Sequence, residues 1–186
     1  LTATLTFTTP ATVGSNKASS FKIALMDFNN AGLAADLGRP NALYQGLPGY
    51  AVFLDVNKTD SGDDIDVREH DVTATAGNFL ASSSDWDSLG SSANADYSFA
   101  ATTEYVVVIE VERTATDSMN ITATLSESGV GQLDTYTATD DSGIVNNFGM
   151  LGIMANSGVF GSVTAKGAAE DNGITFSNIK IEVDGG

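Results

Sequence analysis

The sequence predicts an all-β fold, either a sandwich or a barrel of antiparallel strands. Three observations support this prediction: many short segments alternate apolar and polar residues, turn-forming residues separate them, and no helical periodicity extends over a long segment. The chain has 186 residues, of which 42% are hydrophobic, so it is long enough to bury a core. With no linker or internal repeat in view, we expect one domain over residues 1–186.

The first half of the chain predicts a meander of strands. Residues 1–8 alternate apolar side chains with threonine, which predicts a strand with one buried face. Residues 21–28 are apolar on both faces and predict a central strand. Residues 49–56 and 64–71 predict a hairpin around an acidic loop. The remaining expectations are a helical turn at 31–37 and a further strand at 72–80.

The second half predicts a long hairpin and three more strands. Residues 105–113 and 119–125 alternate regularly on either side of a short turn, which is typical of a hairpin. Residues 135–139 predict an edge strand, whereas 148–155 are apolar on both faces and predict a central one. In 173–183 the apolar residues change phase, so we expect a β-bulge near Ser177 and Asn178.

The charge balance excludes several classes of partner. The chain has 24 acidic and 8 basic residues, for a net charge of −16, so it repels phosphate backbones and anionic lipids. No apolar run approaches the roughly 20 residues of a membrane span. Without cysteine there is no disulfide and no thiolate metal site. We therefore expect neither nucleic-acid binding nor membrane insertion, and interpret the chain as a mature extracellular or cell-surface domain.

Several strand segments together resemble the concanavalin A-like lectin and glucanase (LamG-like) jelly rolls. They are FKIALMDFNNAG at 21–32, GLPGYAVFLDV at 46–56, YVVVIEVER with MNITATL at 105–113 and 119–125, FGMLGIM at 148–154, and ITFSNIKIEV at 174–183. The resemblance implies a jelly-roll sandwich of two curved antiparallel sheets with negligible helix. It also implies that the concave sheet binds glycans and that a loop holds calcium.

Enzymatic motifs of this superfamily are matched only loosely. The glucanases carry Glu-x-Asp-x-x-Glu on one strand, and 64–69 (DIDVRE) keeps little more than its spacing. Retaining glycosidases need two carboxyl groups about 5–5.5 Å apart, but strand parity places Glu69 opposite Asp64 and Asp66. The alginate-lyase pattern is absent, and the net charge disfavours a polyanionic substrate. We predict no catalytic residue, and we expect the polar face of this strand to be solvated.

Aromatic side chains are the predicted contacts for a polysaccharide or glycan, because sugar rings stack on aromatic faces. Trp86 is the only tryptophan and lies in a polar loop expected at 81–96, where it could form a binding platform or a plug over the end of the sandwich. Arg68 and His70, two polar residues of the strand expected at 64–71, are the other predicted contacts. The predicted ligand-binding residues are Trp86, Tyr44, Tyr50, Arg68 and His70.

The acidic loop between the strands of the first hairpin predicts a structural calcium site. Calcium takes about six to eight oxygen ligands, and this loop offers carboxylate, amide and hydroxyl oxygens around Gly62. The predicted ligands are Asp55, Asn57, Thr59, Asp60, Asp63 and Asp64. The alternative is a solvated loop held by Asx turns.

Together, these expectations predict that the protein is a non-catalytic carbohydrate-binding domain stabilised by calcium. The alternative is a structural subunit of an extracellular filament or surface layer. The amphipathic strand at 1–8 supports it, because such a strand can pair with an exposed sheet edge of another copy. A third and less favoured hypothesis is that the protein is a glycoside hydrolase or a polysaccharide lyase.

Overall fold

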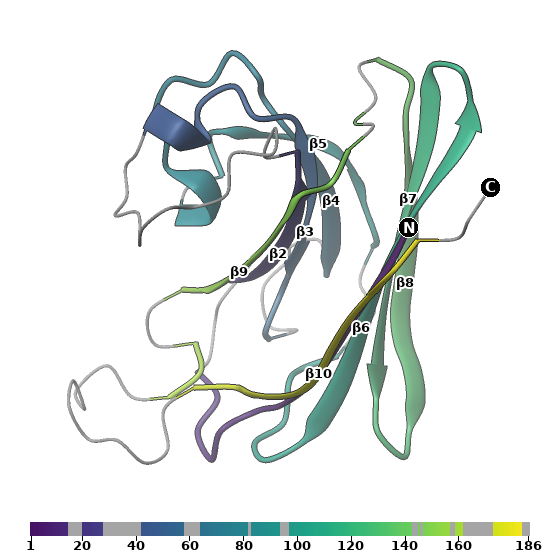
Figure 1. Ribbon diagram of the computed structural model, residues 1–186. Helices are drawn as coiled ribbons and strands as arrows, with labels where there is room; N and C mark the ends of the chain where they lie inside the picture. Colours follow the sequence, from purple (N-terminus) through teal and green to yellow (C-terminus); the bar gives the residue numbers. More distant parts are fainter. Residues whose placement is uncertain are drawn as a thin grey trace.

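A computed structural model describes most of the chain. The described residues are 1–14, 20–27, 42–57, 64–81, 83–93, 97–142, 145, 147–156, 159–161 and 173–183. Over these ranges the strands form two five-stranded antiparallel sheets that pack face to face (Figure 1). The only helices within them are two three-residue 3₁₀ turns, neither long nor apolar enough to cross a membrane. The predicted all-β sandwich is confirmed.

The first sheet has the order β10-β1-β6-β7-β8. Its strands are β1 (Thr2–Thr8), β6 (Glu104–Ala115), β7 (Ser118–Glu127), β8 (Gly131–Asp140) and β10 (Thr175–Glu182). The predicted long hairpin is β6–β7, and β8 is an edge strand as predicted. In β1 every second residue is buried, as its alternation predicts. Because β1 pairs with β10 on one side and β6 on the other, it has no free edge.

The second sheet has the order β5-β4-β3-β2-β9. Its strands are β2 (Phe21–Met26), β3 (Gly49–Leu54), β4 (Ile65–His70), β5 (Trp86–Ser91) and β9 (Met150–Ala155). Every residue of β2 and β3 is buried, which confirms the predicted central position of 21–28. Both faces of this sheet are therefore covered at its two strands β2 and β3.

Two separate apolar clusters cover the two faces. The space between the sheets holds an aromatic group in which Phe7 contacts Phe21 at 5.1 Å and Phe99 contacts Tyr105 at 4.6 Å between ring centroids. Each fully buried ring of this kind stabilises the fold by about 1.5–3 kcal/mol. The outward face of the second sheet carries a smaller cluster, composed mainly of Ala24, Met26, Ala51, Phe53, Leu80 and Trp86.

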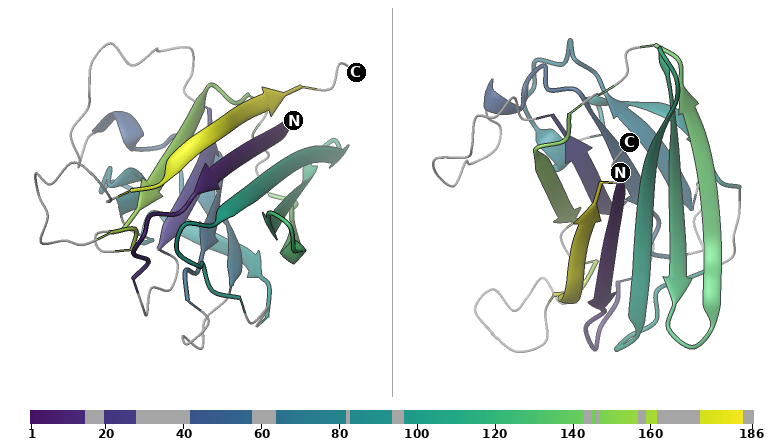
Figure 2. Two further views of the ribbon diagram at one scale, coloured as in Figure 1. Left: turned by 90° about the horizontal axis from the view of Figure 1, so that it is seen from below. Right: turned by 45° about the vertical axis from the view of Figure 1, so that its right-hand side comes forward.

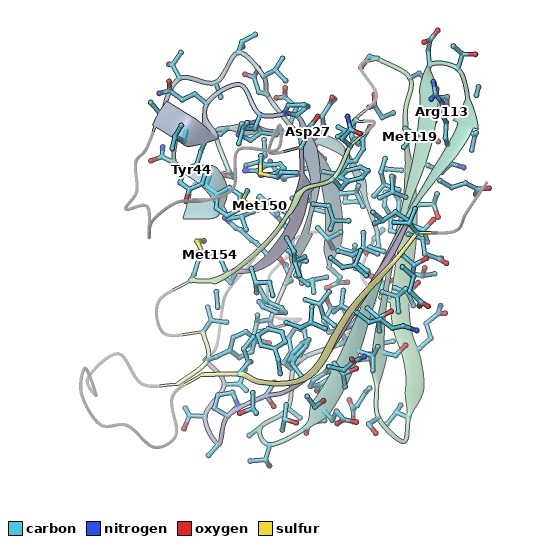
Figure 3. All side chains as sticks on the ribbon, viewed as in Figure 1. Asp27, Tyr44, Arg113, Met119, Met150 and Met154 are labelled. Carbon is cyan, nitrogen blue, oxygen red and sulfur yellow. The ribbon has the colours of Figure 1, made fainter. Side chains whose placement is uncertain are left out.

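The segments around η1 (Ala42–Tyr44) and η2 (Phe79–Ala81) lie over that outward face (Figure 1). Figure 3 shows Tyr44, Met150 and Met154 on this side of the sheet, away from the space between the sheets. The ring of Phe79 stacks on Tyr44 at 5.0 Å and lies against Gly152 of β9, where a Cβ atom would clash with it. This connection therefore acts as a third layer over part of the sandwich.

Three sequence-based expectations about secondary structure are wrong. The stretch 81–96, which is expected to be a loop, contains strand β5. Residues 72–80 form no strand: they carry turns and lead into η2, with Gly77 and Phe79 at positive φ. The segment 148–155 contains β9, which is an edge strand and not a central one. It is apolar on both faces because Phe79 covers its outward side while the core covers the other. The helical turn expected at 31–37 lies outside the described residues.

The predicted bulge in the C-terminal strand is confirmed. Phe176 pairs with Phe7 and Asn178 with Thr6, so Ser177 is the extra residue. The bulge places Ile179 and Ile181 opposite Leu5 and Ala3, on the side of the sheet that faces the core. This change of phase is what allows both ends of β10 to direct apolar side chains toward the sandwich.

Candidate functional site

Charged side chains gather on the outward face of the second sheet. Phe53 pairs with Lys22 of β2 on one side and with Asp66 of β4 on the other. Arg68 follows two residues after Asp66 and pairs with Ser88 of β5. Because alternate residues of a strand share a face, all five are on one side of the sheet. We call these five residues the charged cluster.

The aromatic ring of Phe53 is the centre of this cluster. The Lys22 ammonium lies 4.5 Å and the Arg68 guanidinium carbon 5.0 Å from the ring centroid. Cations at such distances are attracted by the negative face of the ring, more strongly when water is excluded. Lys22 Nζ also donates a hydrogen bond to the Leu80 carbonyl at 3.1 Å, which ties the η2 connection to the sheet.

Asp66 fixes the position of Arg68. Arg68 Nε donates to Asp66 Oδ2 at 2.6 Å, and Ser88 Oγ donates to Asp66 Oδ1 at 2.8 Å. Arg68 Nη1 also donates to the Trp86 carbonyl at 3.0 Å. Asp66 is only 3% exposed, whereas the Arg68 side chain is 20% exposed. The expectation of a solvated polar face is therefore wrong, because the neighbouring strand and connections bury this carboxylate.

The predicted aromatic ligands are buried packing residues in this structure. Trp86 begins β5, and its Nε1 donates to the Phe79 carbonyl at 3.0 Å. Its ring packs against Phe53 and against His70 on the outward face of the second sheet, so Trp86 forms neither an exposed platform nor a plug over the end of the sandwich. Tyr44 is buried in its stack with Phe79.

Tyr50 is separated from the other predicted ligands because it faces the space between the sheets. Its hydroxyl donates to Asp140 Oδ2 at 2.6 Å. Burial and the Asp140 carboxylate raise the pKa of Tyr50 far above its ordinary range. Of the five predicted residues, the structure thus brings Arg68, His70 and Trp86 together and leaves Tyr50 on the opposite face.

His70 is an enclosed imidazole. The side chain is 1% exposed, and its ring lies 4.8 Å from the Trp86 ring in an edge-on arrangement. Burial lowers the pKa of His70, while the nearby Leu47 carbonyl, Asp85 and Asp71 partly oppose this shift. Neither ring nitrogen reaches hydrogen-bonding geometry with a described residue, the Leu47 carbonyl included.

Glu69 points to the other face of β4. It pairs with the core residue Tyr50 and with Asp87 of β5, whereas Asp66 pairs with Phe53 of the outward cluster. Strand parity thus separates the two carboxylates, as the sequence predicts. Burial first, and then the charges of Asp140 and Asp87, raise the pKa of Glu69 to about 7.

The structure describes only the two ends of the predicted calcium loop. Asp55 and Asp64 are both buried, and the Asp55 amide donates to the Asp64 carbonyl at 3.0 Å. Asn57 accepts a hydrogen bond from Ser98, and Tyr97 Oη donates to the Asp64 carbonyl at 2.9 Å. The predicted ligands Thr59, Asp60 and Asp63 lie outside the described residues. Within the described ranges, no three acidic or histidine side chains converge as a metal site.

Two members of the charged cluster carried a signal that the sequence analysis did not use. Lys22 is the one charged residue in the apolar run FKIALM, and Phe53 occupies the matching position of the next apolar strand. A charge inside a strand that is buried on both faces requires a partner. Ser88 carried no such signal, because it lies in a serine-rich stretch where many hydroxyls are equivalent by sequence.

Fold and site together define an antiparallel β-sandwich with a charge-paired cluster on its covered outward face. No family model, curated protein or solved structure matches the chain.

The raised pKa of Glu69 predicts a specific pH dependence of stability. Between about pH 4.5 and 7 the folded protein keeps this proton while the unfolded chain releases it, so the free energy of unfolding falls as pH rises through that window. Glu69→Gln removes this loss, so its Tm relative to wild type should be higher at pH 8 than at pH 5. Glu110→Gln, an exposed residue of β6, is the control. A Tm difference for Glu69→Gln that does not change with pH would contradict the assignment.

Proposed function

We propose that the protein is a non-catalytic carbohydrate-binding domain of jelly-roll type at an extracellular or cell-surface location. Its glycan contacts lie on the outward face of the second sheet, beside Arg68. The observation that carries this proposal is the Asp66–Arg68 pair, in which a buried carboxylate holds a partly exposed guanidinium in one orientation. A fixed donor loses little conformational freedom when it binds a ligand.

The chemistry of Arg68 suits the hydroxyl groups of a sugar. A guanidinium has five N–H donors in a rigid plane, and the contacts to Asp66 and to the Trp86 carbonyl use those on Nε and Nη1. Other donors remain for a ligand at the surface beside the exposed residue Ser88. With a net charge of −16, the protein favours neutral glycans over polyanionic ones.

The placement of the carboxylates supports binding without catalysis. Asp66 is engaged by Arg68 and Ser88, and Glu69 faces the opposite side of β4. This pair does not present two carboxylates to the same sugar ring, which hydrolysis of a glycosidic bond requires.

Structural calcium is the second part of the proposal. Asp55 and Asp64 enclose the acidic loop and are joined through their backbones at its base. Calcium takes carboxylate, carbonyl and hydroxyl oxygens as ligands, and Asp55 and Asp64 would contribute such oxygens from the two ends of the loop. The ion would then hold the ends of β3 and β4 together below the charged cluster.

A structural subunit of a filament or surface layer is the alternative function. The specific observation in its favour is the apolar edge strand β10, which among the described strands pairs only with β1. Strand β1, on which the sequence analysis based this alternative, already pairs on both sides, so assembly through it would first have to displace β10 or β6.

Glycan binding is tested with a glycan array followed by titration calorimetry on the best ligand. Arg68→Ala should weaken the affinity at least tenfold, because a charge-assisted hydrogen bond contributes about 1.5–3 kcal/mol. Ser88→Ala, which disturbs the cluster less, should weaken it by a smaller factor. Arg113→Ala, at an exposed site on β6, should leave the affinity unchanged. A wild-type protein that binds no neutral or anionic glycan, or equal affinity in Arg68→Ala, would refute the proposal.

Calcium binding is tested by thermal unfolding with and without a chelator. A ligand that binds only the folded state stabilises it in proportion to RT ln(1 + [L]/Kd). EDTA should therefore lower the Tm of the wild type, and excess calcium should restore it. Asp64→Asn should reduce this response, while Asp117→Asn, in the exposed β6–β7 turn, should keep it. If EDTA leaves the wild-type Tm unchanged, calcium is not part of the structure.

A further inference from the structure

We propose that β10 pairs with β10 of a second copy of this chain, in antiparallel orientation, to join two five-stranded sheets into one continuous sheet. The first observation is the exposure of its apolar side chains. Ile179 and Ile181 are each 48% exposed and Val183 is 75% exposed, although the first two lie on the core-facing side of the sheet. A long edge strand with exposed apolar residues favours pairing with another strand.

The two sides of the sandwich differ sharply. On one side β5 and β8 meet: Ser92 Oγ donates to Asp134 Oδ2 at 2.6 Å, and Tyr136 lies directly over Gly90. On the other side lie β9 and β10 (Figure 2). There Ile181 lines a hollow of about 120 Å³ with Leu25, Met150 and Leu151. Among the described residues, apolar core-facing side chains of a sheet edge are strongly exposed on this side, at Ile179 and Ile181.

The sequence of β10 is complementary to itself in one antiparallel register. When a two-fold axis passes beside Ile181, Ile181 faces its own copy and Ile179 faces Val183. Lys180 then faces Glu182 of the other copy on the outer face, and the same pair forms a second time by symmetry. Opposite charges and apolar pairs placed directly across an antiparallel ladder are stabilising.

Each neighbouring register of the same parity places one pair of like charges directly opposite each other. Shifting the axis by one residue in one direction places Lys180 against its own copy, and shifting it in the other places Glu182 against its own copy. Like charges directly opposite each other destabilise a pair of strands. Within one chain Lys180 and Glu182 already form an exposed ion pair at 2.7 Å, so both side chains extend from the outer face without a core contact to break.

The apolar face gives this contact its driving force. Val183 lines a second hollow, of about 340 Å³, together with Leu1, Val111, Met119 and Phe148. In the joined sheet, Ile179, Ile181 and Val183 of one copy pack beside the same residues of the other, next to these two hollows. Apolar burial offsets the repulsion between two chains that each carry a net charge of −16.

The charge pattern allows a direct test by sedimentation velocity at physiological salt. The protein concentration should run from about 10 μM to 1 mM, because a weak dimer dissociates in this range. Wild type should change from monomer to dimer within this range. Lys180→Glu alone and Glu182→Lys alone should each weaken dimerisation at least tenfold, whereas an equimolar mixture of the two variants should dimerise like wild type. Glu110→Lys is the control, because it makes the same charge change as Glu182→Lys but on the interior strand β6. It should not alter dimerisation.

Disulfide trapping tests the register independently, because the chain contains no cysteine. Directly opposite residues of an antiparallel pair have Cα atoms about 4.5–5.5 Å apart, within the range of a disulfide. Under mild oxidation Ile181→Cys should form a covalent dimer, whereas Ile179→Cys should do so only when mixed with Val183→Cys. A wild type that remains monomeric to 1 mM, or equal cross-linking of Ile179→Cys and Ile181→Cys when each is oxidised alone, would overturn the proposal.

Discussion

Burial of both faces of the second sheet is the constraint on which the rest of the structure depends. The aromatic core covers one face, and the connection through η2 covers much of the other. The ring of Phe79 occupies the space that a side chain at Gly152 would fill. Lys22 Nζ, on the sheet, donates a hydrogen bond to the Leu80 carbonyl of this connection. Since this cover excludes water, charges on the sheet need partners within the protein, and the contacts of Lys22 and Asp66 follow from that need.

Local pattern predicted the strands well and their surroundings poorly. The alternation of β1, the phase break at Ser177 and the opposite orientations of Asp66 and Glu69 all follow from the period of two along a strand. The cover formed by Phe79 and Leu80 comes from a polar, turn-rich stretch and depends on contacts with residues far away in sequence. For this reason the burial of Trp86 and His70 and the edge position of β9 could not be predicted.

The two sides of the sandwich have different physical characters. Hydrogen bonding between Ser92 and Asp134 closes the β5–β8 side with polar groups. The β9–β10 side has exposed apolar side chains on β10, which pairs on one side only among the described strands, and natural sheets usually protect such an edge. Arg68 lies on the outward face of the second sheet, while β10 belongs to the first sheet. The proposed ligand contact at Arg68 and the proposed self-association at β10 would therefore use separate surfaces.

The most direct test of the covered sheet is a double-mutant cycle between Gly152 and Phe79, measured by urea unfolding. Gly152→Ala should cost about 1–3 kcal/mol in the wild type, because its methyl group overlaps the Phe79 ring. In a Phe79→Ala background the same substitution should cost little, because the ring that it overlaps has been removed. An equal cost of Gly152→Ala in both backgrounds would contradict the packing of this connection on β9, and with it the covered face.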